Sequence, residues 1–396
     1  MKTYIRVEKL FAGWAILLPV QWKLGIILGL LCWPALVRAD ADLSTPLSSG
    51  GRGFTYHHDI VAGVPWSIHI VKIDRERTDF EFTTTLAKGS NFGLSTLTEQ
   101  IKVLPAEWGH PVAAINGDFW NEHPKYPGDP KGLQIHHGEL VSTPSERPSF
   151  WIDPAGKPQI GTVTTQFKVI WPNGATTPFG INEEREYNTA VLYTPTLGPS
   201  TRTTGGHELV LESIGSVNGL PLRAGQTYVV RVREVRDKGD TPISRDSLVL
   251  SLGPQLVARL PKISPGMELK IATMTSPDLS GVTTAIGGGP VLVHGGKAME
   301  WKPPPPRHPR TAIGWNEKYL FLVEVDGRQA GLSVGMTFPE LADYLVKLGC
   351  EEALNLDGGA STTMWVYGQV MNSPSAGHER NMANALVLLQ KEKPLK

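Results

Sequence analysis

The stretch that decides the fold is "YLFLVEVDGRQAGLSVGMTFPELADYLVKLGCEEALNL", residues 319–356. It begins with an apolar run that closes on an acid and a glycine, which is typical of a buried strand and its turn. It ends with a second short apolar run, "ALNL". Between the two runs, Thr337 and Glu340 have the spacing of a helix capping box. This order predicts a right-handed β-α-β unit, which brings Asp326 and Asp357 to one rim if its strands are parallel.

Strand patterns dominate the rest of the chain. The runs "PWSIHIVKID" and "FEFTTTLA" alternate apolar and polar residues like paired strands, and "PVAAINGDFW" predicts a buried strand that ends in a turn. Residues 150–285 contain further strand-like runs and few helical patterns, whereas "STLTEQIKVL" predicts a short helix capped by Ser95 or Thr96. We therefore expect an α+β fold of mixed β-sheets and a few helices, with the β-α-β unit in the C-terminal third.

The composition excludes several classes of protein. Lys plus Arg and Asp plus Glu both number 38 in the 396 residues, so no net charge favours nucleic acid or an anionic membrane. The chain has neither the Gly-x-Ser-x-Gly motif of a serine hydrolase nor a Walker loop. If a signal peptide is removed with Cys32, only Cys350 remains, which excludes an intramolecular disulfide and predicts a buried small side chain.

The N-terminus has the pattern of an export signal. Basic residues precede two apolar runs, and small residues near position 41 suit a signal peptidase. We interpret residues 1–41 as a signal peptide, with a membrane anchor as the alternative, and residues 42–54 as a flexible tether. The expected catalytic domain is 55–390, with a β-rich section at about 150–285. These features predict a secreted or periplasmic protein, held at a membrane only if the N-terminal segment is uncleaved.

The loop "NLDGGASTTMW", residues 355–365, predicts a ligand site at the end of the last strand of the β-α-β unit. Asp357 would be the first residue at the carboxyl edge, where open sheets bind ligands. Gly358 and Gly359 suit an anion-binding nest of backbone N–H groups, and hydroxyls follow from Ser361 onward. A plain turn is the alternative, because Asp-Gly-Gly is common turn material.

Four segments resemble the phosphodiester glycosidase family. They are "AINGDFW", "GGGPVLVHGGK", "PRTAIGW" and the long string from "VEVDGRQAG" to "NMANALVLL". The resemblance extends in order over about residues 110–390 and is dense from 308 onward. It implies hydrolysis of the bond between a sugar anomeric carbon and a phosphodiester oxygen.

The resemblance also implies roles for particular residues. The family's acid-Gly-Gly-Ser motif falls on Asp357, Gly358, Gly359 and Ser361, with Ala360 where the family has a third glycine. Asp357 would be the catalytic carboxylate, and Glu379 or Asp118 the second one, since glycosidic cleavage commonly uses two. Arg310 and Arg380 would hold the phosphate. The expected substrate-binding residues are Asn116, Arg310, Thr311, Asp326, Arg328, Asn355, Gly358, Gly359, Ser361, Thr362, Asn372 and Arg380.

Two functions from different classes fit these observations. The first is an exported hydrolase that acts on sugar-1-phosphodiesters in envelope or exopolysaccharide glycans. The second is a non-catalytic protein that binds or assembles glycans, with the aromatic rings of Phe119, Trp120 and Trp365 stacked on sugars.

A metal requirement stays open at this stage. Calcium or magnesium would suit the oxygen ligands of Asp118, Asp326, Asp357, Asn116 and Asn355, although no EF-hand spacing is present. The pairs at 57–58 and 136–137 are expected to be surface histidines rather than zinc ligands, because neighbours in a strand point to opposite faces.

Overall fold

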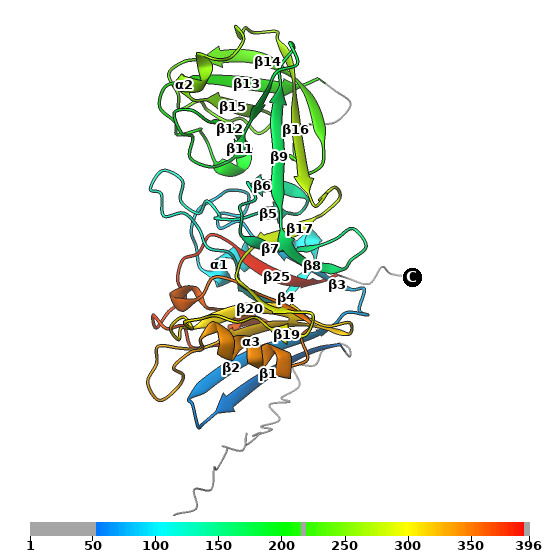
Figure 1. Ribbon diagram of the computed structural model, residues 1–396, viewed down its shortest axis with the longest axis vertical. Coiled ribbons are helices and arrows are strands. Elements are labelled where there is room, and N and C mark those ends of the chain that lie inside the picture. Colours follow the sequence, from blue (N-terminus) through cyan, green and yellow to red (C-terminus); the bar gives the residue numbers. More distant parts are fainter. Residues whose placement is uncertain (1–52, 215–218, 392–396) are drawn as a thin grey trace, which may run out of the picture. The chain divides into compact units, whose positions relative to one another are not determined.

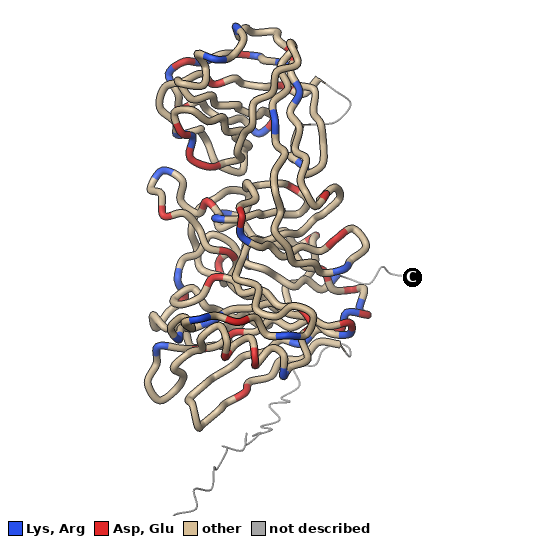
Figure 2. The backbone as a smooth tube through the Cα atoms, viewed as in Figure 1, with Lys and Arg blue, Asp and Glu red and all other residues tan. Residues whose placement is uncertain are grey.

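β-Strands predominate among the residues that the computed structural model describes, which are 53–214 and 219–391 (Figure 1). These strands form four sheets, which we name A to D. Acidic and basic residues are interspersed along the chain (Figure 2). Within this part of the chain, no helix combines the length and the apolar character that crossing a membrane requires. The expected signal peptide and residues 42–52 of the tether lie outside the described residues, and Phe54 already begins strand β1.

Sheets A and B form the inner layers of a four-layer arrangement. In spatial order, sheet A contains β1 (Phe54–Val61), β2 (Trp66–Asp74), β21 (Tyr319–Val325), β20 (Arg310–Trp315), β22 (Glu352–Asn355), β18 (Val291–His294) and β19 (Lys297–Ala298). Sheet B contains β24 (Gln369–Val370), β23 (Met364–Val366), β4 (His110–Asn116), β25 (Ala385–Gln390) and β3 (Phe80–Thr84). The two sheets enclose one apolar core, to which β2, β20 and β21 contribute from one side and β4, β23 and β25 from the other.

Two helices cover the outer faces of these sheets. Helix α3 (Phe338–Lys347) packs its buried leucines onto the outer face of sheet A, together with Ile68 and Val323. Helix α1 (Leu97–Lys102) packs onto the outer face of sheet B, with Ala114 and Val387. Helix α3 begins at the predicted capping box on Thr337, and α1 begins at Thr96, one of its two predicted caps, which also forms a capping box with Glu99.

Sheets C and D make up most of the β-rich middle section. Sheet C contains β6 (Glu139–Ser142), β5 (Gln134–His136), β17 (Thr284–Gly287), β7 (Pro148–Ile152) and β8 (Pro158–Thr162). Sheet D contains β10 (Thr176–Pro178), β9 (Thr164–Ile170), β16 (Glu268–Ser276), β14 (Thr227–Arg236), β13 (His207–Ser213), β15 (Leu248–Leu252), β12 (Ala190–Tyr193) and β11 (Gly180–Ile181). Sheet D shares an apolar core with sheet C, to which Phe167, Tyr228 and Leu250 contribute from sheet D and Ile135 and Leu140 from sheet C. The remaining helices are short: α2 (Pro254–Val257), η1 (Ala106–Trp108), η2 (Pro195–Leu197) and η3 (Gly359–Ser361).

The fold is mostly β-sheet with few helices, which confirms this part of the prediction. Strands β21 and β22 flank α3, but β20 lies between them and pairs antiparallel with both. They therefore run in the same direction without pairing, and the expected β-α-β unit is not confirmed. Strands β2 and β3 are not partners either, because β2 belongs to sheet A and β3 to sheet B. Hydrophobic alternation identifies strands but carries no information on which strand lies beside which.

Candidate functional site

Two loops meet where β4 and β22 end, and each presents a buried carboxylate. Asp357 follows β22, and its backbone N–H donates to the carbonyl of Gly117 at 3.0 Å. The Asn116 side-chain amide donates to the Asp357 carbonyl at 2.7 Å and accepts from the Thr311 hydroxyl at 2.6 Å. Asn116 and Thr311 are thus internal ties that hold the Asp118 loop against the Asp357 loop.

Asp118 is buried, with 1 % of its surface exposed. Its Oδ1 accepts from the Phe119 N–H at 2.8 Å and from Arg147 at 3.2 Å, whereas its Oδ2 makes no well-aligned hydrogen bond with any described residue. Burial raises the pKa of Asp118 to about 6, the charge of Asp357 adds to the rise, and Arg147 opposes it. The Asp118 carboxyl is therefore stabilised in its protonated form and is suited to donate a proton.

Asp357 lies in a more polar setting than Asp118. Its Oδ1 accepts from the Gly358 N–H at 2.9 Å, and Ser361 also forms a hydrogen bond to the carboxylate. Burial raises the pKa of Asp357, and the hydrogen bonds and two nearby arginines counter that rise. The charged form of Asp357 is therefore stabilised by two hydrogen bonds and two arginines, whereas burial opposes it.

The two arginines near Asp357 come from different parts of the chain. Arg147 precedes β7, binds Asp118 and lies over the ring of Phe119. Arg380 donates to the Ser361 hydroxyl at 3.2 Å and lies over the ring of Trp120, 4.6 Å from its centroid. Both side chains remain partly exposed, so each can receive an anion from solvent.

A pocket of about 530 Å³ has Arg380 in its wall, whereas neither Asp118 nor Asp357 belongs to its lining. Its lining includes Trp120, His123, His378, Glu379 and Arg380. Arg380 links the pocket to Asp357 through Ser361. A pocket with an aromatic wall and a cationic edge suits a sugar that carries a negatively charged group.

Two glycines make room for the Asp118 carboxyl group, because neither has a side chain. A β-carbon at Gly287 would lie 2.3 Å from Asp118 Oδ2, and one at Gly132 would lie 2.8 Å from the same atom. Both distances are shorter than carbon–oxygen contacts allow, so an alanine at either position has to displace the carboxyl group.

We expect Gly287→Ala to lower the free energy of unfolding by about 2 kcal/mol, because added atoms in a packed interior force their neighbours to move. Asp118 should also lose its position, and with it any activity that depends on it. Thermal unfolding measures the first effect. Gly219→Ala is the matched control, since its β-carbon has no contact closer than 3.5 Å; equal destabilisation by both variants would contradict the prediction.

The expected anion nest at Gly358 and Gly359 is not available. The Gly358 N–H donates to Asp357, and the Gly359 N–H donates to the carbonyl of Pro309 at 2.9 Å. Position 359 still favours glycine, because its φ is +63° and a β-carbon there would lie 3.0 Å from the guanidinium of Arg328. The loop therefore positions Asp357 and Ser361 rather than offering free N–H groups.

Arg310 and Arg328 have contacts outside the pair of carboxylates. The Arg310 guanidinium donates to the carbonyls of Met336 and Pro306, each at 2.9 Å, and lies over the ring of Phe338. These contacts do not support the expected role of Arg310 in holding a phosphate. Arg328 is exposed, has a φ of +60° and contacts His308 at 3.1 Å.

Other expected site residues have mainly structural contacts. Glu379 accepts from the Thr98 N–H at 3.0 Å, in the first turn of α1. Asn355 donates to the carbonyl of Gly289 at 3.0 Å. The Thr362 hydroxyl is buried and has no hydrogen-bond partner in the part of the chain that the structure describes. Asp326 and Asn372 contact each other at 3.4 Å in a separate cluster around His69.

The sequence pattern around two of these residues, Arg147 and Glu324, differs in how much it indicates. Arg147 lies in an ordinary Ser-, Pro- and Glu-containing loop, and nothing local indicates that it reaches Asp118. Glu324 did carry a signal, because it occupies the apolar face of a strand, in alternation with Leu320 and Leu322. His136 proves to be buried instead of exposed.

Comparison with known sequences supports the resemblance to one family. Residues 224–389 match the family model described as phosphodiester glycosidase. The resemblance to the phosphodiester glycosidase family is confirmed. The match covers less than half of the chain; it includes Asp357 and Arg380, whereas Asp118 and Arg147 precede it.

Two curated relatives match over short segments. The bovine (Bos taurus) N-acetylglucosamine-1-phosphodiester alpha-N-acetylglucosaminidase is 38% identical over 74 residues, which is 18% of this chain and 14% of that protein. The SPbeta prophage-derived protein YomE of Bacillus subtilis is 36% identical over 83 residues, which is 21% of this chain and 13% of YomE. Each matched segment thus covers only a small part of the relative.

Solved structures show the same fold. A protein of Synechocystis superposes with a TM-score of 0.66 at 20% identity, over 86% of this chain and 62% of its own. A protein of Burkholderia pseudomallei superposes with a TM-score of 0.63 at 22% identity, over 82% of this chain and 74% of its own. At these identities the likeness concerns the fold alone.

Proposed function

We propose that this protein is a hydrolase that cleaves the bond between a sugar anomeric carbon and a phosphodiester oxygen. The observation that carries the proposal is the pair of buried carboxylates, Asp118 and Asp357, with a partly exposed arginine beside each. Glycoside hydrolysis commonly uses two carboxylates in different protonation states. The family match and the short bovine match favour a phosphodiester as the substrate.

Asp118 serves as the proton donor in this proposal. Its burial favours the neutral carboxyl, and its Oδ2 has no partner within the described protein that would compete for the proton. The proton goes to the phosphate oxygen as the glycosidic bond breaks. Asp118 is a better candidate than Glu379, because the carboxylate of Glu379 is bound to the first turn of α1.

Asp357 serves as the charged carboxylate, acting as a nucleophile or as a base for water. The Gly358 N–H and the Ser361 hydroxyl hold it in one orientation, which an attack on the anomeric carbon requires. Its negative charge also stabilises the positive charge that develops on the sugar in the transition state.

Arg147 and Arg380 hold the phosphate in this arrangement. A phosphate leaving group is a weaker base than a sugar hydroxyl, so positive charge near it contributes much of the stabilisation. Arginine binds phosphate oxygens through two parallel hydrogen bonds, and both guanidinium groups have exposed surface for this purpose. We also propose that the protein is exported and that its substrate belongs to envelope or exopolysaccharide glycans.

We expect Arg380→Gln to raise KM for a sugar phosphodiester by about 10-fold to 100-fold, because a charged hydrogen bond to the substrate is lost. Arg310→Gln should instead lower the melting temperature and leave KM within about 3-fold, because its guanidinium serves protein carbonyls. Steady-state kinetics and thermal unfolding of both variants check this contrast. A larger change in KM for Arg310→Gln would contradict it.

The pH dependence of hydrolysis should reflect Asp118. A proton donor with a pKa of about 6 is active below that pH, so kcat/KM should fall as the pH rises through about 6. Values of kcat/KM measured from pH 4 to pH 9 check this decrease. A rate that stays constant from pH 5 to pH 8 would exclude Asp118 as an obligatory acid.

The proposal itself is tested with the purified chain and N-acetylglucosamine-1-phosphodiester, the substrate named for the bovine relative, alongside other sugar-1-phosphodiesters. Release of free sugar by the wild type is the expected result. Failure to hydrolyse any substrate, combined with saturable glycan binding, would instead support a glycan-binding protein.

A further inference from the structure

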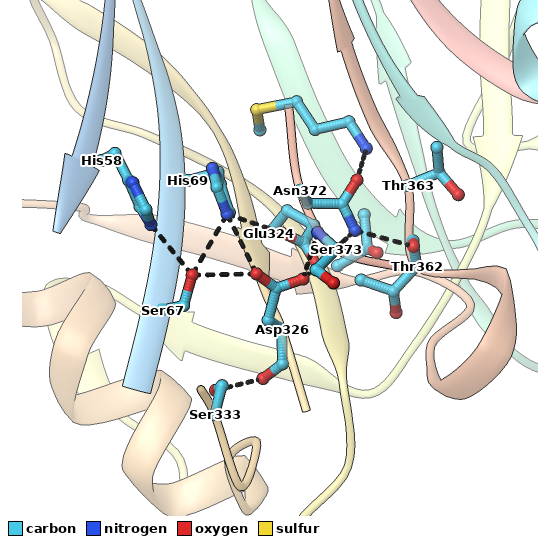
Figure 3. A network of polar contacts seen from close by, with 12 residues as sticks. His58, Ser67, His69, Glu324, Asp326, Ser333, Thr362, Thr363, Asn372 and Ser373 are labelled. Atoms are coloured by element: carbon cyan, nitrogen blue, oxygen red, sulfur yellow. Dashed lines mark hydrogen bonds and ion pairs between the residues drawn. The ribbon is translucent and has the colours of Figure 1, made fainter. Parts of the chain in front are cut away.

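A second group of buried polar side chains, distinct from Asp118 and Asp357, lies across strands of sheet A. His58, His69 and Glu324 are neighbours across β1, β2 and β21, since His58 pairs with His69 and His69 pairs with Glu324. Asp326 directly follows β21, and its backbone N–H donates to the carbonyl of Ser67 at 3.0 Å. Figure 3 shows the side chains of His69, Glu324 and Asp326 directed toward one another, and each is at most 2 % exposed.

This cluster is the one place in residues 53–214 and 219–391 where at least three metal-ligating side chains converge. The three ligating atoms, one each from His69, Glu324 and Asp326, lie within 4.8 Å of one another. His69 Nε2 is 3.1 Å from Asp326 Oδ2 and 3.9 Å from Glu324 Oε2. Tetrahedral zinc, with ligand bonds of about 2.0–2.2 Å, separates its ligands by a little over 3 Å, so small shifts would complete the site.

Each of the three side chains is anchored through an atom that does not face the cluster. His69 Nδ1 contacts the Tyr56 hydroxyl at 2.7 Å. Asp326 Oδ1 accepts from the backbone N–H of Ser373 at 2.8 Å, and Glu324 Oε1 accepts from Asn372 at 3.2 Å. Metal-ligating histidines and carboxylates have this kind of outer support, which fixes their orientation.

One converging atom has no partner. Glu324 Oε2 is buried, makes no hydrogen bond among the described residues, and faces His69. A buried carboxylate oxygen without a hydrogen bond is costly, so its occurrence in a well-packed sheet indicates a missing ligand.

The cluster contains no cationic side chain other than His69. In the described part of the chain, the ion pairs of Glu324 and Asp326 involve His69 alone, and neither carboxylate pairs with a lysine or an arginine. Ser67 donates a hydrogen bond to Asp326 at 2.8 Å but adds no charge. The space between the three side chains is therefore open to a cation, with no lysine or arginine to compete for the carboxylates.

We propose that His69 Nε2, Glu324 Oε2 and Asp326 Oδ2 bind a divalent transition-metal ion, with zinc as the best match. An imidazole nitrogen in the donor set disfavours calcium and magnesium, which prefer oxygen alone. Neutral His69 then keeps its proton on Nδ1, toward the oxygen of Tyr56, and presents the Nε2 lone pair to the ion.

The ion would connect three parts of the fold, one of which contacts the segment that follows Asp357. It joins β2, β21 and the segment of Asn372, whose amide also donates to the Thr362 carbonyl at 3.1 Å. Asn372 Oδ1 accepts from the Met364 N–H at 2.9 Å, at the start of β23. The bound ion therefore stabilises the segment that follows Asp357, without contacting a substrate itself.

The test uses the full chain, purified without a histidine tag. After treatment with a chelator, zinc chloride alone should rebind at one equivalent per chain, measured by plasma mass spectrometry and calorimetry. The melting temperature should rise by about 5 °C in excess zinc, because only the folded state holds the three ligands together. X-ray absorption should show a first shell of nitrogen and oxygen.

Three variants locate the ion. Glu324→Gln should weaken zinc binding by at least about 100-fold and abolish the melting-temperature shift, while Tyr56→Phe should weaken binding by about 10-fold. His136→Gln removes another buried histidine, which contacts Thr84 instead, and should bind zinc like the wild type. If Glu324→Gln does not fold, Tyr56→Phe still tests the site.

Two results would overturn the proposal. The first is a wild-type chain that binds neither zinc nor manganese, which would indicate a protonated Glu324 in a buried polar network. The second is unchanged zinc binding by Tyr56→Phe and Glu324→Gln, which would place the ion elsewhere.

Discussion

Asp357→Asn should abolish the release of sugar from a phosphodiester, by about 1,000-fold or more in kcat, while the protein stays folded. Asparagine keeps the shape of the side chain and can still accept the Gly358 N–H through Oδ1. It has neither the negative charge that stabilises the transition state nor the nucleophilic oxygen. Burial raises the pKa of Asp357, so an uncharged side chain is also easier to accommodate than the carboxylate.

Asp343→Asn is the matched control for this variant. Asp343 is an exposed acid on α3, so its replacement should change neither kcat nor the melting temperature. Circular dichroism and thermal unfolding establish that both variants are folded. A folded Asp357→Asn variant with more than about a tenth of the wild-type kcat would exclude Asp357 as the catalytic carboxylate.

Asp118→Asn should reduce hydrolysis by about 100-fold or more and at the same time stabilise the protein at neutral pH. The pKa of Asp118 is about 6 in the folded protein against 3.8 for the unperturbed group. The folded state therefore holds the proton more tightly, and the resulting stability is present below pH 3.8 and lost as the pH rises through about 6. Above that pH, folding has to bury a charged carboxylate.

Asparagine removes the cost of burying this charge. The gain in the free energy of unfolding should reach up to about 3 kcal/mol at pH 7.5 and vanish near pH 4. Urea unfolding at both pH values measures the difference. A loss of stability at pH 7.5 would mean that the ion pair with Arg147 contributes more than the cost of burying the charge. Glu379→Gln is the control for the catalytic role of Asp118. It should hydrolyse the substrate at a rate within about 3-fold of wild type, because Glu379 is bound to the first turn of α1.

Local sequence patterns predicted the local structure well. The capping boxes at Thr96 and Thr337 define both longer helices, and the turn after Asn116 lies where glycine and aspartate follow the apolar run. Cys350 is free and buried, as its apolar surroundings suggested. These features depend on residues within a few positions of one another, which periodicity and turn chemistry describe.

Contacts between distant segments were beyond such patterns. Strand β20 inserts between β21 and β22, although the order of strands in the sequence suggests a neighbouring pair. Arg147 reaches Asp118 from a loop with no recognisable motif, and Arg310 turns away to the carbonyls of Met336 and Pro306. The direction of a long side chain depends on the acceptors around it, and those come from elsewhere in the chain.

The central claim is that the bond between the anomeric carbon and oxygen breaks, and hydrolysis in water labelled with ¹⁸O tests it most directly. The wild type is incubated with a sugar-1-phosphodiester, and both products are analysed by mass spectrometry. Cleavage at the anomeric carbon predicts the label in the sugar hydroxyl and none in the phosphate. Label in the phosphate would mean that the phosphorus–oxygen bond breaks, which would contradict a glycosidase mechanism.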